Sequence, residues 1–435
     1  MRQLSFQDRG QPLLDIMTSA PDWACSSCLK DEFIREICTS NSLQFRCCGC
    51  GMHGQSGASI YQIAERIRGA LQQHYELDIG LYRGYELSLS QIVSRAIGCE
   101  SQAVNEAVSS VLEDEESGEE SGDSLDEESF YFPGQSYRRM QSPFDSEDHE
   151  RWYVVSDWDH VARDLVHGRR FFNDKAREFF TRLLNEAMTA TTLEAPDVAA
   201  VMQILPEGTP IYRSRVSRDE NQTSLFRDCP AKELGAAPRS IAANNRMSAA
   251  GVPVFYGSAE VETCIAEVRP SIGDTVVAGQ FRTSRTLKLF DFTKLDYRLR
   301  HEPLSLLDPK HEQRSMDRTL LSYLHEEIAK PMRSNDTGYV VTQALTEFIR
   351  YGRIENFDGV VFQSVQRQNG LNYALFDEDD PSAPQSLDGR SRFPVDILAG
   401  AVTEHVVDSL SYLTTNPACG VQSPSPNVGS AFSWK

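Results

Sequence analysis

An arginine, a tyrosine and a glutamate, Arg246, Tyr256 and Glu267, lie close together in the chain. Arg246 precedes a short run, residues 252–256, that is typical of a β-strand. Glu267 lies near the end of the next segment, where apolar residues recur at helical spacing. Ser258 is the predicted N-cap of that helix. The stretch therefore predicts a strand–turn–helix unit that holds a cation, a phenol and a carboxylate near one another.

The surroundings of this stretch are basic in an acidic chain. Residues 211–258 contain seven Lys or Arg and four Asp or Glu, whereas the whole chain has a formal net charge of −20. The strand predicted over residues 211–216 places Arg213 and Arg215 on one face, because side chains alternate along a strand. A site for an anionic pyrophosphate needs such a local excess of positive charge. For Arg218, Arg227 and Arg239, unliganded surface positions explain the pattern equally well.

These residues, with the run 357–364 that ends in Ser364 and the segment 370–373 that contains Asn372, resemble the RES domain, which is named for its Arg, Glu and Ser. The resemblance covers about residues 205–385. It implies an α+β domain with a β-sheet core and helices, similar in fold to ADP-ribosyltransferases. Several members are toxins that consume NAD+, so the resemblance implies NAD+ as substrate. The catalytic residues that we infer are Arg246, Tyr256, Glu267 and Ser364, and the cofactor-binding residues are Arg213, Arg215, Gly257 and Asn372.

If the ligand is NAD+, nicotinamide leaves as a neutral molecule and positive charge accumulates on the ribose, as in glycoside cleavage. A carboxylate on the ribose hydroxyls would stabilise that charge, which is the role expected of Glu267. Tyr256 would shape the nicotinamide pocket, and Arg246 would bind phosphate or orient the ribose. Ser364 would hydrogen-bond the ribose or Glu267. The acceptor stays open: water or phosphate in an NAD+-degrading toxin or defence effector, or a protein in an ADP-ribosyltransferase.

The N-terminal part contains two Cys-x-x-Cys pairs, Cys25 with Cys28 and Cys47 with Cys50, separated by 18 residues. Two such pairs can direct four thiolates at one tetrahedral zinc ion. We expect this zinc to be structural, because four thiolates leave no open position for water. Reduced structural cysteines or a redox pair are the alternative. This part also resembles the Cys-rich, HEPN-associated domain that precedes some RES domains.

Two further functions stay open for the N-terminal half. An amphipathic helix predicted over residues 59–75 carries Arg68 and His74, which fall within the loose Arg and His spacing of HEPN ribonucleases; we expect solvated helix residues instead. In an adaptor, the zinc knuckle would bind a partner or nucleic acid, and the RES-like domain would be inert.

The predicted organisation has six parts. A Cys-rich zinc knuckle at 1–55 is followed by a helical region at 56–112. An acidic, disordered linker or insertion at 113–150 separates it from a second helical region at 151–196. The RES domain at 205–400 and a tail at 401–435 complete the chain. The run 113–128 contains ten acidic residues and no Lys or Arg, so it cannot bury enough apolar surface to order itself. A docking segment for a basic partner is the alternative. No Gly-x-Gly-x-x-Gly motif follows a predicted strand, so a Rossmann domain is not supported.

The composition sets limits on the class of protein. A chain of 435 residues with 40% hydrophobic residues requires two or three domains. The sequence has no apolar stretch of about 18 residues and no signal core, so we expect a cytoplasmic protein with no membrane contact. Ten cysteines in a chain of this length do not form a disulfide scaffold. We expect a homo-oligomer with an antitoxin or sensor partner. Nucleic acid is not expected at the RES domain and stays open for the N-terminal domain.

Overall fold

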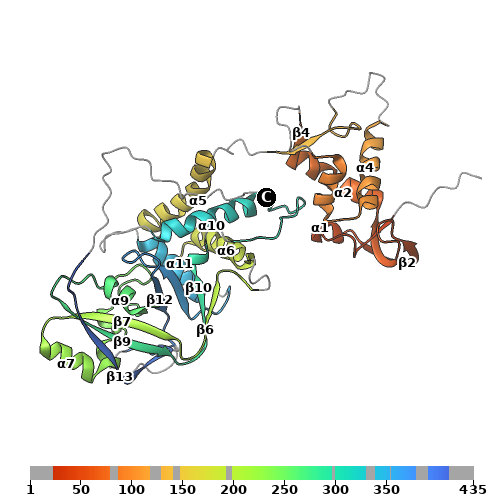
Figure 1. Cartoon of the computed structure of the whole chain (residues 1–435). Coiled ribbons are helices and arrows are strands. Elements are labelled where there is room, and N and C mark those ends of the chain that lie inside the picture. The colour runs from red at the N-terminus through yellow and green to blue at the C-terminus, as the bar shows by residue number, and fades with distance from the viewer. Residues whose placement is uncertain are drawn as a thin grey trace, which may run out of the picture. The chain divides into compact units, whose positions relative to one another are not determined.

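The computed structural model describes residues 23–78, 87–117, 129–140, 147–192, 198–295, 299–329, 339–352, 354–378 and 390–410. The chain divides into two compact units (Figure 1). The first consists of residues 1–200 and 295–324, and the second of residues 201–294 and 325–435. Within the described ranges, no helix is long and apolar enough to cross a membrane.

The first unit begins with a small antiparallel sheet of strand order β1-β3-β2. Its strands are β1 (Trp23–Cys25), β2 (Thr39–Arg46) and β3 (His53–Ser59), and the short helix α1 (Glu32–Arg35) lies between β1 and β2. A second sheet has two strands, β4 (Tyr75–Leu77) and β5 (Tyr137–Arg139). The helices that follow the first sheet are α2 (Ile60–His74), α3 (Leu89–Ile97) and α4 (Gln102–Ser117).

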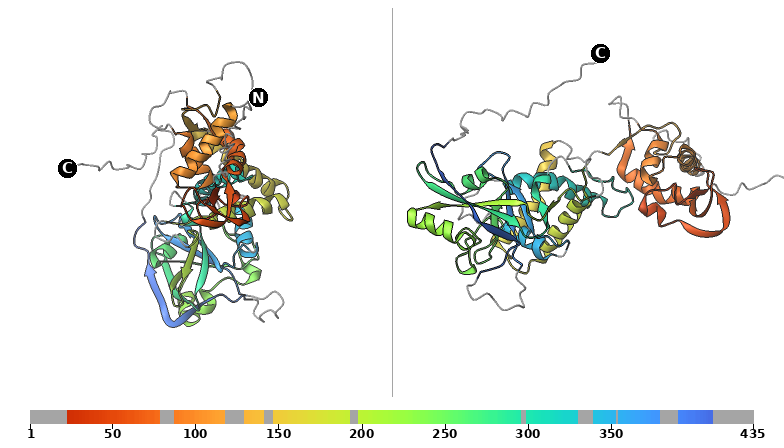
Figure 2. Two further views of the ribbon diagram at one scale, coloured as in Figure 1. Left: turned by 90° about the vertical axis from the view of Figure 1, so that its right-hand side faces the viewer. Right: turned by 60° about the horizontal axis from the view of Figure 1, so that its bottom comes forward.

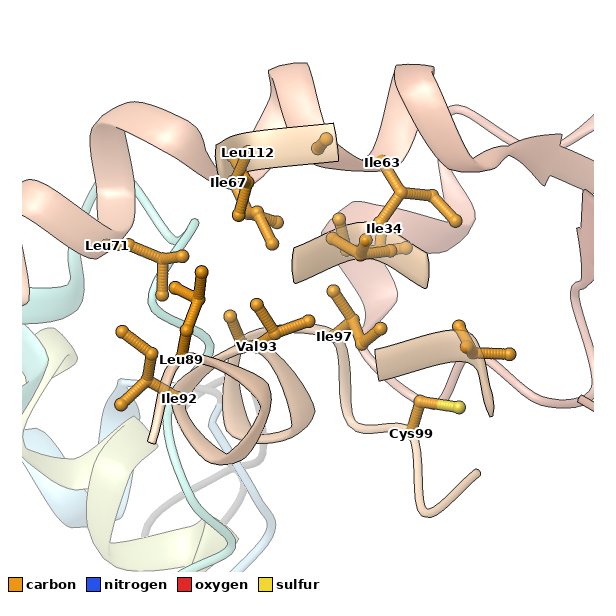
Figure 3. Packing of buried hydrophobic residues seen from close by; sticks show 14 of the residues in the cluster. Ile34, Ile63, Ile67, Leu71, Leu89, Ile92, Val93, Ile97, Cys99 and Leu112 are labelled. Atoms are coloured by element: carbon orange, nitrogen blue, oxygen red, sulfur yellow. The ribbon is translucent and has the colours of Figure 1, made fainter. Parts of the chain in front are cut away.

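Helix α2 confirms the amphipathic helix predicted from residue 59. Its N-terminus is a capping box, in which the Ser59 hydroxyl accepts from the Gln62 N–H and the Gln62 side chain accepts from the Ser59 N–H. The apolar stripe of α2 packs against α3 in a buried cluster that also includes Ile34 and Leu112 (Figure 3). The labelled members from the two helices are Ile63, Ile67, Leu71, Leu89, Ile92, Val93 and Ile97. Burial of these aliphatic side chains holds the small sheet and the helices together.

The acidic linker expected over 113–150 is shorter than predicted. Helix α4 continues to Ser117, and residues 129–140 form turns and strand β5. Tyr131 and Tyr137 are completely buried in the same cluster as α2, and their hydroxyls donate to the backbone carbonyls of Arg68 and Phe130. The aromatic residues after the acidic run therefore return the chain to the core. Residues 118–128 and 141–146 lie outside the described residues.

The rest of the first unit contains helices α5 (Glu147–His167) and α6 (Asp174–Thr189), together with residues from the segment 295–324, where α10 (His311–Ala329) begins. Ion pairs between partly exposed arginines and buried carboxylates join α6 to α10. Arg182 donates Nε and Nη2 to Asp317 at 2.8 and 3.1 Å, and Arg314 and Arg318 both donate to Glu186. The predicted RES boundary at 205–400 therefore includes a segment that packs with the N-terminal unit. Sequence pattern alone did not indicate this, because the pairing joins residues more than 120 positions apart.

The second unit is built on an eight-stranded mixed sheet of order β13-β9-β7-β8-β12-β11-β10-β6. The strands are β6 (Met202–Leu205), β7 (Pro210–Ser217), β8 (Phe255–Ser258), β9 (Thr275–Thr283), β10 (Leu287–Asp291), β11 (Gly359–Gln363), β12 (Leu371–Leu375) and β13 (Val395–Val406). Only the β10–β11 pair is parallel. The mixed α+β class that we predicted is thus confirmed, and β13 extends past the predicted domain end at residue 400. Residues 411–435 of the expected tail lie outside the described residues.

Short helices accompany this sheet. They are α7 (Glu220–Asp228), α8 (Pro230–Glu233), the 3-10 turns η1 (Arg239–Ile241) and η2 (Phe292–Lys294), α9 (Val261–Glu267) and α11 (Tyr339–Tyr351). Helix α7 lies beside the end of the sheet formed by β7, β9 and β13 (Figure 2). Strands β7 and β8 pair only at Tyr212 and Ser258. The two halves of the sheet consequently part at this point, and the side chains near it become accessible to a ligand.

Candidate active site and metal centre

A cleft of about 450 Å³ opens where β7 and β8 part, which is a volume typical of small-molecule sites. Among its lining residues, four are charged: Arg213, Arg246, Glu267 and Arg269. Three guanidinium groups and one carboxylate leave the cleft with net positive charge in an acidic protein. The local excess of positive charge predicted for residues 211–258 is therefore present at a concave surface that suits an anionic ligand.

Glu267, at the end of α9, is held by two donors from the neighbouring strands. Its Oε1 accepts a hydrogen bond from Ser364 Oγ at 2.6 Å and another from Asn372 Nδ2 at 2.7 Å. Ser364 and Asn372 are both buried, and Asn372 Oδ1 in turn accepts from Ser258 Oγ at 2.7 Å. This chain of hydrogen bonds fixes one carboxylate oxygen. In the part of the chain that the structure describes, no protein donor contacts the other oxygen, Oε2.

Ser258 does not cap α9, contrary to the prediction. The N-cap is Glu260, which makes no side-chain capping bond. Ser258 is instead the last residue of β8, where its hydroxyl is used to orient Asn372. The physical reason is the register of the sheet, because Asn372 stands directly opposite Ser258 on the adjacent antiparallel strand.

The loop that carries Arg246 is anchored by Tyr256. The Tyr256 hydroxyl accepts from the Met247 N–H at 3.1 Å and lies 3.2 Å from Ser248 Oγ. Burial raises the pKa of Tyr256 to about 12, so the phenol stays protonated at neutral pH. Burial also lowers the pKa of Arg246, and the neighbouring Tyr339, Glu267 and Tyr256 act in the opposite direction. The phenol therefore supports the arginine loop, in addition to lining the cleft.

Helix α11 holds the other side of this loop. Gln343 Nε2 lies within hydrogen-bond distance of the carbonyl oxygens of Asn245 and Ser248, at 2.6 and 3.1 Å. Thr342 donates to the carbonyl of Arg246 at 2.8 Å, and a further contact joins Thr346 to Met247. The sequence analysis gave these polar residues no function. Three uncharged polar residues at positions i, i+1 and i+4 within an amphipathic helix were the signal that could have identified them.

Arg213 lies deeper in the cleft. Its Nη1 donates to the carbonyl of Tyr256, whereas its Nε is buried without a partner among the described residues. Burial, with the nearby charge of Arg215, lowers the pKa of Arg213 to about 10. A cation is thus held here at a desolvation cost that an anion in the cleft would offset.

Of the predicted cofactor-binding residues Arg215 and Gly257, only Gly257 lines the cleft. Arg215 lies two residues beyond Arg213 on β7 and outside the cleft. Its Nη2 reaches the carbonyl of Gly235 at 3.4 Å. Gly257 does line the cleft, yet its lack of a side chain serves packing: a Cβ there would lie 2.4 Å from Ile211 Cγ2. Glycine is required for the close approach of β8 to β7.

The sequence of residues 210–396 matches the RES domain family. This chain carries a RES domain. No curated protein and no solved structure shows significant similarity to it. The residues that we inferred from the resemblance lie on β7, β8, α9 and β12, in the loop before β8 and directly after β11.

The four predicted cysteines converge in the first unit. The sulfur atoms of Cys25, Cys28, Cys47 and Cys50 all lie within 4.8 Å of one another. Tetrahedral zinc with Zn–S bonds of about 2.3 Å requires sulfur separations of about 3.8 Å. The Cys25–Cys50 and Cys28–Cys47 separations are 3.7 and 3.8 Å. Burial raises the pKa of Cys47, but the backbone N–H groups of Cys50, Cys25 and Gly49 have the opposite effect. Together these influences lower the pKa to about 7. The arrangement fits a zinc ion bound by four thiolates.

Arg68 and His74 have separate neighbours in the first unit. The Arg68 guanidinium lies 5.1 Å from the centre of the Tyr131 ring, whereas the His74 ring packs at 4.4 Å from that of His311. Both residues are half-buried, so the expectation of a solvated helix face was wrong. Burial and the charge of Arg139 lower the pKa of His74, which disfavours the charged imidazolium.

We predict that Gln343→Ala loosens the arginine loop of the RES domain. The Asn245 and Ser248 amides bond to each other's carbonyl oxygens, which the Gln343 amide also contacts. Loss of one or two hydrogen bonds should speed hydrogen exchange at these amides about tenfold. Exchange measured by mass spectrometry on peptides covering residues 244–248 checks this.

Glu347→Ala, an exposed position on the same helix, is the matched control and should leave exchange unchanged. Gln343→Glu keeps the shape but cannot donate, so it should behave as the alanine variant does. Exchange as slow as in the wild type in both Gln343 variants would show that α11 does not hold the loop.

Proposed function

We propose that this RES-domain protein cleaves the bond between nicotinamide and ribose in NAD+, and that it acts as a toxin or defence effector. RES domains are associated with NAD+-related toxin–antitoxin systems, which supports the general kind of function. The observation that carries the proposal is the carboxylate of Glu267, fixed by Ser364 and Asn372 on one oxygen inside a positively charged cleft. We also infer that the domain has an ADP-ribosyltransferase-like fold.

The reaction follows from the charge of the substrate. The electron pair of the bond between C1′ and the nicotinamide nitrogen moves to the nitrogen, which neutralises the pyridinium ring. Positive charge then spreads over C1′ and the ring oxygen of the ribose. Glu267 Oε2, which has no protein donor among the described residues, accepts from a ribose hydroxyl and stabilises this charge. A nucleophilic oxygen attacks C1′, and its proton passes to solvent.

The remaining residues bind and orient the substrate. Arg246, whose loop is fixed by Tyr256 and α11, places a cation near Glu267 and pairs with a phosphate of NAD+. Arg213 supplies a second, buried cation. Ser364 and Asn372 act through Glu267 and are positioning residues. Arg215 receives no role in the reaction, because it lies outside the cleft.

Chromatography of NAD+ incubated with the purified full-length protein tests the proposal. We expect free nicotinamide, with ADP-ribose as the partner product if water is the acceptor and its 1″-phosphate if added phosphate is used. Modified protein in place of either product would indicate an ADP-ribosyltransferase. NADH is the control, because its dihydronicotinamide is not a cationic leaving group and should not be released. Intact NAD+, or equal cleavage of NADH, would contradict the proposed reaction.

We further propose that the four-cysteine cluster binds a structural zinc ion. The zinc would join β1 and the turn after it to the turn that follows β2. Four thiolates leave no coordination site for substrate, so the metal has no part in the cleavage of NAD+.

A further inference from the structure

Arg269 has a backbone conformation that its residue type does not favour. Its φ is +49°, which lies in the left-handed region where a side chain is strained. It directly follows Val268, the C-cap of α9, at a position that proteins usually fill with glycine or asparagine. Helix termination alone therefore does not explain an arginine at this position.

The strained backbone places two charged residues in the same cleft. Side chains two residues apart on an α-helix point about 200° apart, because each residue turns the helix by about 100°. Had α9 continued, Glu267 and residue 269 would face opposite sides. The left-handed turn at Arg269 ends the helix, and both Glu267 and Arg269 line the cleft.

The guanidinium of Arg269 is available to a ligand. The residue is exposed, and within the described ranges its side chain has no hydrogen-bond or ion-pair partner, whereas Arg213 donates to a carbonyl and Arg246 lies near Glu267. An exposed cation that is held at the cost of backbone strain in the same cleft as the Glu267 carboxylate points to an anion in the bound state.

We propose that Arg269 binds the diphosphate of the dinucleotide and so selects substrates that contain a diphosphate. This rests on the proposed function, in which Glu267 contacts the ribose. Two residues along the chain span at most about 7 Å, and Glu267 and Arg269 line the same cleft, so a dinucleotide whose ribose contacts Glu267 would bring its adjacent phosphate toward Arg269. Arg269 thereby acts as a specificity residue for dinucleotides over nucleosides.

Arg269→Gly separates this role from a structural one. Glycine relieves the strained backbone, so the melting temperature should rise by about 2 °C. The affinity for ADP, used as a diphosphate probe in calorimetry, should fall about 10- to 100-fold, the range for loss of charge-assisted hydrogen bonds. Binding of adenosine should not change. Arg269→Lys should lose part of the ADP affinity without the gain in melting temperature.

Phe172→Gly is the matched control, because Phe172 is also left-handed, with φ of +53°, and does not line the cleft. It should raise the melting temperature and leave ADP binding unchanged. The inference is overturned if the wild type does not bind ADP, or if Arg269→Gly binds it as tightly as the wild type does. Because ADP binding needs no turnover, this result is independent of whether NAD+ is cleaved.

Discussion

Glu267→Gln is expected to lower kcat for NAD+ cleavage about 1,000-fold. Ser364 and Asn372 both donate to Oε1, and the glutamine oxygen can accept the same two hydrogen bonds. The substitution therefore keeps the position of the side chain and removes its negative charge. Loss of one preorganised electrostatic group commonly costs 10²- to 10³-fold in kcat, and here the full charge opposite the ribose is lost. Released nicotinamide, measured at saturating NAD+, gives this value.

Glu262→Gln is the matched control, since Glu262 is exposed on the same short helix and should leave kcat unchanged. The melting temperature and the affinity for ADP should stay near wild type in Glu267→Gln. A Glu267→Gln protein that keeps more than a tenth of the wild-type kcat would exclude Glu267 as the stabilising carboxylate.

Removal of the four-cysteine cluster is expected to unfold the small sheet of the first unit. The purified protein should contain one zinc per chain, and Cys47→Ser or Cys50→Ser should abolish it. Structural zinc contributes about 10–16 kcal/mol to the folding of zinc-finger peptides, which exceeds the stability of most domains. Zinc content by metal analysis and limited proteolysis of residues 23–59 measure the two effects.

Cys38→Ser is the control, because Cys38 lies in the same region but outside the cluster. It should retain zinc and resist proteolysis as the wild type does. A wild-type protein free of metal, with an intact fold in the Cys47→Ser variant, would support reduced structural cysteines instead.

The sequence indicated those residues of the cleft that belong to consecutive elements of the chain. Arg246, Tyr256 and Glu267 come from one loop, strand and helix, so local patterns of turns and apolar spacing were sufficient to bring them together. The cysteine pairs were equally local, because each two-residue spacing directs both sulfurs the same way. Arg215 was misplaced because strand alternation gives the face of a side chain but not where the cleft ends.

Only the tertiary structure decided how distant segments complete the site. Asn372 stands opposite both Ser258 and Phe362 because β12 pairs with β8 and β11, and this register brings Asn372 and Ser364 to Glu267. The sequence pattern likewise did not indicate that α11 supports the loop of Arg246, or that the backbone turns left-handed at Arg269.

The sequence by itself therefore indicated the α+β class, the cysteine pairs and the membership of Arg246, Tyr256 and Glu267 in one local unit, since these follow from residue type and short spacing. The tertiary structure decided which oxygen of Glu267 is occupied, what holds Arg246, and that residues 295–324 pack with the N-terminal unit. The physical reason is that hydrogen-bond register and partly buried ion pairs join residues about 100 positions apart, and local propensity does not record such pairings.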